Sequence, residues 1–141
     1  MVQGWAFWAL LSAAFAALTA IFAKVGVAGV PSDLATLIRT CIILVVLSVI
    51  VVITGQWQSP LSISGRSWLF LGLSGLATGA SWAAYFRALK LGDAARVAPV
   101  DKLSIVLVAI FGVVFLGEKL SLLHWFAVGM IAAGAIILAI F

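Results

Sequence analysis

The chain has 141 residues, of which 66% are apolar and 9% are charged, and its net charge is +4. Soluble domains are about 45–50% apolar and about 25% charged. Eight basic and four acidic side chains cannot cover the surface of a soluble monomer of this length. The composition therefore excludes a soluble globular fold, and its high hydrophobicity excludes intrinsic disorder. We predict an all-α integral membrane protein.

Five apolar runs of 19–21 residues follow one another along the chain. At 1.5 Å per residue, each predicted helix is about 30 Å long, which is the thickness of the hydrocarbon core. Strands of a membrane barrel are only about ten residues long and alternate polar with apolar positions, so the runs exclude a barrel. We expect one membrane domain over residues 1–141, with helices near residues 5–23, 34–54, 68–86, 97–116 and 123–141.

Turn and capping residues mark the ends of these runs. Ser32 or Asp33 is a suitable first residue for the second helix, and Asp93, after Leu91-Gly92, is a suitable N-cap for the fourth. Residues 117–121, Gly-Glu-Lys-Leu-Ser, predict a tight turn between the last two helices. These short connections leave no room for a soluble domain.

The basic residues predict the orientation of the five helices. They occur singly, which is typical of residues that orient membrane helices and not of a nucleic-acid-binding surface. Six of them, against two, lie on the side of the first and third connections, which favours an N-terminus outside and a C-terminus inside. If Lys24, Arg39 and Lys102 lie within the membrane, the charges nearly balance, and the chain can insert in both orientations.

No motif indicates catalysis or metal binding. The chain has one cysteine and one histidine, Cys41 and His124, which excludes an intrachain disulfide and a cluster of cysteine or paired histidine ligands within one chain. It also lacks a nucleophile elbow, a P-loop, a zinc-protease motif and a glycine-rich dinucleotide turn. We therefore expect no enzyme activity, no cofactor and no metal.

Two predicted helices carry stripes of aromatic and hydroxyl side chains. In the first helix, residues spaced by four and three share one face, and the third helix repeats the pattern. Such stripes suit a water-accessible path for an organic molecule. The alternative is that the hydroxyls bond their own backbone and the rings pack between helices. The stripes are Trp8, Ser12, Phe15, Thr19 and Phe22, and Ser74, Thr78, Ser81 or Trp82, and Tyr85.

Asp101 and Lys102 lie inside the fourth apolar run, about 8 Å from its middle. Charges at membrane depth are costly and usually functional. If the helix begins before Pro99, the proline leaves a carbonyl without its donor, and a broken helix with an acid and a base is typical of a transport site. The alternative is a helix that begins at Pro99, with the pair at the interface and Lys102 reaching outward.

Arg39 stands five residues into the second run. Its long side chain can reach outward to the membrane surface, or it can turn inward and bind an anion. The sequence leaves both alternatives open.

An ordered set of short motifs resembles the EamA domain of the drug/metabolite transporter superfamily. Residues 88–140 contain Ala88-Leu89, Gly92, Val97-Ala98-Pro99, Leu116-Gly117-Glu118-Lys119, and the glycines Gly129 and Gly134 of the last helix. Lys24 and Arg39 also match the family's basic residues at the end of its first helix and early in its second. The chain departs from the pattern after Pro99, where Asp101-Lys102-Leu103-Ser104 replaces uncharged residues and a second proline.

The resemblance implies one half of a ten-helix inverted-repeat transporter fold, whose site lies between the repeats. It implies a transporter of small organic metabolites or drug-like compounds by alternating access. The working unit would be a dimer with an antiparallel second copy or a small homologous subunit, in a bacterial inner membrane. A lipid-linked-sugar flippase subunit and a non-transporting membrane scaffold are alternatives. The expected substrate path comprises Phe15, Thr19, Arg39, Thr78, Trp82, Tyr85, Asp101, Lys102 and Ser104.

Overall fold

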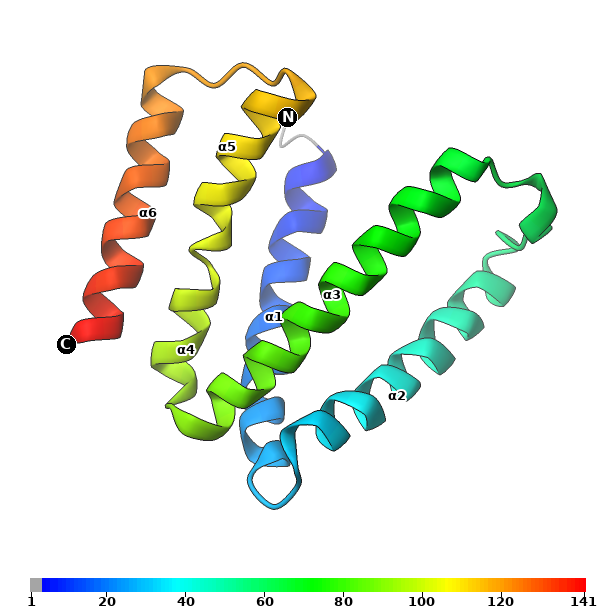
Figure 1. Cartoon of the computed structure of the whole chain (residues 1–141), viewed down its shortest axis with the longest axis horizontal. Helices are drawn as coiled ribbons and strands as arrows, with labels where there is room; N and C mark the ends of the chain where they lie inside the picture. The colour runs from blue at the N-terminus through cyan, green and yellow to red at the C-terminus, as the bar shows by residue number, and fades with distance from the viewer. Residues whose placement is uncertain (1–3) are drawn as a thin grey trace. The chain divides into compact units, whose positions relative to one another are not determined.

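The computed structural model describes residues 4–141 (Figure 1), and these residues form helices and no strand. Five helical spans are long and apolar enough to cross a membrane, which confirms the predicted all-helical membrane fold. The fourth span, Ala94–Leu116, contains two helices. The elements are α1 (Gly4–Val27), α2 (Ser32–Ile53), the 3-10 turn η1 (Pro60–Ser62), α3 (Gly65–Leu91), α4 (Ala94–Asp101), α5 (Ser104–Leu116) and α6 (Leu122–Ile140).

Two of the helices extend beyond the C-terminal ends of their apolar runs. α3 continues to Leu91 where the apolar run ends at residue 86, and α1 continues to Val27 where the run ends at residue 23. The added turns carry Lys24, Arg87 and Lys90. Their side chains donate to the Leu89 carbonyl, the Asp33 carboxylate and the Val30 carbonyl, respectively. At the ends of α1 and α3, the helix therefore continues past the apolar run through residues whose charged side chains have polar partners.

The chain divides into two compact units, and each is described by itself. Unit 1 comprises residues 4–22 and 91–141, and unit 2 comprises residues 23–90. In unit 1, α4 and α5 both pack against α6. Arg96 on α4 donates from Nη2 to the carbonyl oxygen of Ala139 at 2.9 Å. The negative end of the α6 dipole also stabilises a cation at this position.

In unit 2, the end of α1 and the following turn are tied to the end of α3. The Nζ of Lys24 donates to the carbonyl oxygen of Leu89 at 2.7 Å, and the Nζ of Lys90 donates to the carbonyl oxygen of Val30 at 2.9 Å. Leu89 and Val27 are the most deeply buried side chains, with 0% and 1% exposure. Lys24 thus satisfies a carbonyl in the last turn of α3, which has no partner within its own helix, and Lys90 satisfies a carbonyl in the turn between α1 and α2.

Most other apolar side chains of the chain are exposed, and α2 contains no buried residue. In a soluble domain such exposure would be an aggregation hazard. On membrane-spanning helices it is the surface that lipid or a partner helix covers.

Candidate functional site

Unit 2 brings together two of the residues predicted for the substrate path, Arg39 and Trp82. Arg39 lies on α2, about 10 Å along the helix from its start at Ser32. Its Cζ atom stands 4.1 Å from the centroid of the Trp82 ring on α3. This distance is within the range of a cation–π interaction. The side chain of Arg39 therefore turns toward α3.

Other aromatic residues of α3 surround the guanidinium of Arg39. Phe86 lies 5.6 Å from the Arg39 Cζ and is buried with 3% exposure. Tyr85 is close enough for its hydroxyl to interact with the charge of Arg39. Tyr85 and Phe86 also form an edge-to-face pair with centroids 6.5 Å apart. The result is a single half-buried cation beside three aromatic side chains.

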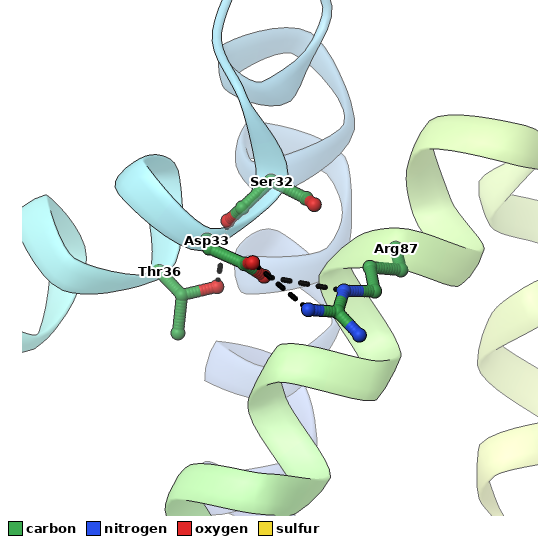
Figure 2. Close-up of polar contacts among 4 residues, drawn as sticks. All are labelled: Ser32, Asp33, Thr36 and Arg87. Atoms are coloured by element: carbon green, nitrogen blue, oxygen red, sulfur yellow. Dashed lines mark hydrogen bonds and ion pairs between the residues drawn. The ribbon is translucent and has the colours of Figure 1, made fainter.

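Unit 2 also contains an ion pair that the sequence did not reveal. Arg87 on α3 binds Asp33 on α2 through two parallel bonds, Nε to Oδ1 at 3.2 Å and Nη2 to Oδ2 at 2.8 Å. Figure 2 shows the two bonds, together with the bond from Thr36 Oγ1 to the Ser32 carbonyl oxygen. Both side chains of the pair are 62% exposed. The two residues are 54 positions apart in the sequence, so no local motif includes both. The sequence predicts only that they lie near the same surface of the membrane.

The hydroxyl of Thr78 bonds the backbone of its own helix, as in the alternative to a substrate path. Its Oγ1 donates to the carbonyl oxygen of Ser74, one turn earlier in α3, at 2.8 Å. The same pattern recurs at Thr40 and Ser48 of α2. Such bonds satisfy a hydroxyl in an apolar surrounding without any ligand. Thr78 can therefore line a path without its hydroxyl hydrogen being free to donate to a substrate.

In unit 1, Asp101 and Lys102 stand where the fourth span breaks. α4 begins at Ala94, so Pro99 lies inside a helix, as in the first of the two alternatives. α4 ends at Asp101, and α5 begins at Ser104. Across the junction, Leu103 N donates to Val100 O and Ile105 N to Lys102 O, both at 3.0 Å. These bonds reach back three residues and tighten the chain locally into 3-10 geometry.

The charged pair at this break is close but loosely held. Lys102 Nζ lies 3.3 Å from Asp101 Oδ2, and the two side chains are 54% and 36% exposed, respectively. Lys102 and Leu103 separate the two helices, and Ser104 follows as the exposed first residue of α5. The structure thus gathers Asp101, Lys102 and Ser104 at one helix junction.

The two remaining predicted residues lie on α1. Phe15 is 60% exposed and Thr19 is half-buried, and both belong to unit 1. They share one face of the helix with Trp8, Ser12 and Phe22, as the spacing predicts. The predicted path residues accordingly fall into an α2–α3 group in unit 2 and an α1, α4–α5 group in unit 1.

The family model described as the EamA-like transporter family matches residues 3–140. The chain belongs to this family. The EamA-like chain is also 74% identical, over the full length of both chains, to a Sinorhizobium sp. protein named an uncharacterized transporter in cobO 3'region. No solved structure matches the chain described here. Together with the five apolar spans, these findings indicate a multi-pass membrane protein that is a transporter and point away from an enzyme.

The structure also explains one motif of this EamA-like chain, Leu116-Gly117-Glu118-Lys119. Gly117 ends α5 in the left-handed region with φ +68°, where a side chain is strained. Glu118 then folds back over Gly112, where an added Cβ would lie 2.5 Å from the carboxylate oxygen Oε2. The Glu118 N–H donates to the Gly112 carbonyl oxygen at 3.0 Å. The motif is therefore a helix stop, and its residues act on the fold of unit 1.

Proposed function

We propose that this EamA-like chain transports small organic metabolites or drug-like molecules by alternating access. The observation that carries the proposal is the broken fourth span with Asp101 and Lys102 at its junction. Asp101 lies about 6 Å along the helix from the middle of the span Ala94–Leu116. Irregular backbone and charges at such depth are tolerated where they line a water-filled path or are covered by protein.

Each unit contains its own group of proposed path residues. Asp101 is the group that exchanges a proton or binds a substrate charge, and Lys102 is its counter-charge at the junction. Ser104, Thr19 and Phe15 line the path in unit 1, and the α3 residues Thr78, Trp82 and Tyr85 line it in unit 2. Transporter sites commonly lie at such helix breaks, between two repeats.

Residues 4–141 supply five membrane spans, and the proposed working unit pairs them with an antiparallel second copy or a small homologous subunit in a dimer. Gly72, Gly75 and Gly79 of α3 support this proposal, because no heavy atom lies within 4 Å of a Cβ built at any of them. Small residues in such open stretches allow a second helix to approach closely. The relative from Sinorhizobium sp. supports a bacterial inner membrane as the location.

Transport is tested with purified protein in liposomes that carry a pH gradient, offering organic acids, amines and neutral compounds. We expect Asp101→Asn to abolish gradient-driven uptake while the protein keeps its helical content. Asp93→Asn is the matched control, because Asp93 caps α4 without a side-chain bond to the helix. Uptake by Asp101→Asn equal to that of the unaltered chain would refute the role of Asp101.

The dimer is tested by cysteine labelling of both termini in intact cells, in a Cys41→Ala background. We expect each terminus to be labelled from both sides of the membrane, because an antiparallel homodimer needs both orientations. Labelling of each terminus from one side only would refute the homodimer and leave the oppositely oriented homologous subunit. One fixed orientation together with no uptake of any compound would instead favour the scaffold.

A further inference from the structure

The charge of Arg39 has no acidic counterpart within residues 4–141. These residues contain all four acids of the chain and form two ion pairs, Arg87–Asp33 and Lys102–Asp101. Neither pair includes Arg39, and Asp33, the acid on the same helix, is held by both of its oxygens. Arg39 is thus a cation within a membrane span that only aromatic rings stabilise.

The surroundings of Arg39 are suited to a ligand that is both anionic and apolar. A guanidinium beside an aromatic ring keeps planar N–H donors that match the two oxygens of a carboxylate or a phosphate. The rings of Trp82 and Phe86 provide apolar contact beside it. A cation at membrane depth is costly without a partner, so an incoming anion that pairs with it recovers favourable electrostatic energy.

We propose that Arg39, positioned by Trp82, binds the carboxylate or phosphate group of an organic anion. This inference rests on the proposed transport function and narrows its substrates to anionic molecules with an apolar part. A soluble organic anion and an anionic lipid headgroup offer the same chemistry, and the experiment separates them.

The test measures binding to the full chain in phosphatidylcholine nanodiscs by isothermal titration calorimetry. The probes are benzoate and phenyl phosphate, with benzamide as the neutral counterpart. We expect both anions to bind and benzamide not to bind. Arg39→Gln should weaken anion binding about tenfold or more, since charged hydrogen bonds are lost. Arg39→Lys, which keeps the charge but loses the fork of donors, should fall between the two.

Arg66→Gln is the matched control, because Arg66 also faces an aromatic ring of its own helix, with its Cζ 5.9 Å from the Phe70 centroid. It should bind the anions as the unaltered chain does. Circular dichroism of every variant checks that the helices remain.

The lipid source is examined in nanodiscs of equal phosphatidylcholine and phosphatidylglycerol. If the soluble anions fail to bind but phosphatidylglycerol is retained in an Arg39-dependent way, as counted by native mass spectrometry, the ligand is a lipid headgroup and the anion site stands. Anion and lipid binding that are both unchanged in Arg39→Gln, or benzamide binding as tight as benzoate binding, would overturn the proposal. Arg39-dependent binding without uptake in liposomes would instead count against transport alone.

Discussion

We expect the contact between Arg39 and Trp82 to make a measurable contribution to the free energy of unfolding. A cation–π contact contributes about 0.5–1 kcal/mol when exposed and about 2 kcal/mol when removed from water. At 4.1 Å the guanidinium lies well inside the range of the interaction, and both side chains are half-buried. We therefore expect a coupling free energy of about 1–1.5 kcal/mol between the two residues.

The assay is a double-mutant cycle of Arg39→Gln and Trp82→Leu, with the free energy of unfolding taken from titration with sodium dodecyl sulfate in mixed micelles. Leucine retains an apolar side chain but removes the aromatic ring. Arg66→Gln and Phe70→Leu form the reference cycle, because that pair is 5.9 Å apart and exposed. Its coupling should be about 0.5 kcal/mol or less. A coupling for Arg39 and Trp82 no larger than that of the reference pair would refute the reasoning.

Three further substitutions have expected outcomes. Gly117→Ala should lower the free energy of unfolding by about 1–2 kcal/mol, because Gly117 has a φ of +68°. Gly129→Ala is the control and should not lower it, because the added Cβ has open space. Equal losses of the two variants in the detergent titration would contradict this prediction. Arg87→Asp should lower the thermal midpoint, and adding Asp33→Arg should restore it by reversing the ion pair; the absence of restoration would refute the pairing. Pro99→Ala should stabilise α4 by up to about 3 kcal/mol and slow uptake in liposomes, and unchanged uptake would show that the break is not needed.

The sequence predicts the five spans because the hydrocarbon core demands about 20 apolar residues in each. It predicts their ends less well. Apolar runs mark the part of a helix in lipid, whereas α3 continues through Arg87 and Lys90 because these side chains bind Asp33 and the Val30 carbonyl. Such partners come from another helix, so the length of an apolar run does not reveal them. Asp93, by contrast, stands at the predicted N-cap position of α4, although its side chain makes no bond to the helix.

The candidate site was predictable as residue types and not as contacts. A charge in an apolar run singles out Arg39, and the aromatic stripe singles out Trp82, but their approach depends on how α2 and α3 rotate about their axes. The Asp33–Arg87 pair has no sequence signal beyond two opposite charges near the same membrane surface. The position of the break at Lys102 and Leu103, three residues after Pro99, likewise follows from the local 3-10 bonding and not from the proline alone.

The two lysines that tie the end of α1 to the end of α3 also bear on how the protein is made. Lys24 donates to the Leu89 carbonyl oxygen, and Lys90 donates to the Val30 carbonyl oxygen, so the donors and acceptors of these two bonds all lie within residues 23–90. A nascent chain therefore contains all the groups of these two bonds once its third span has left the ribosome. We expect both bonds to be able to form while residues 91–141 are still to be synthesised.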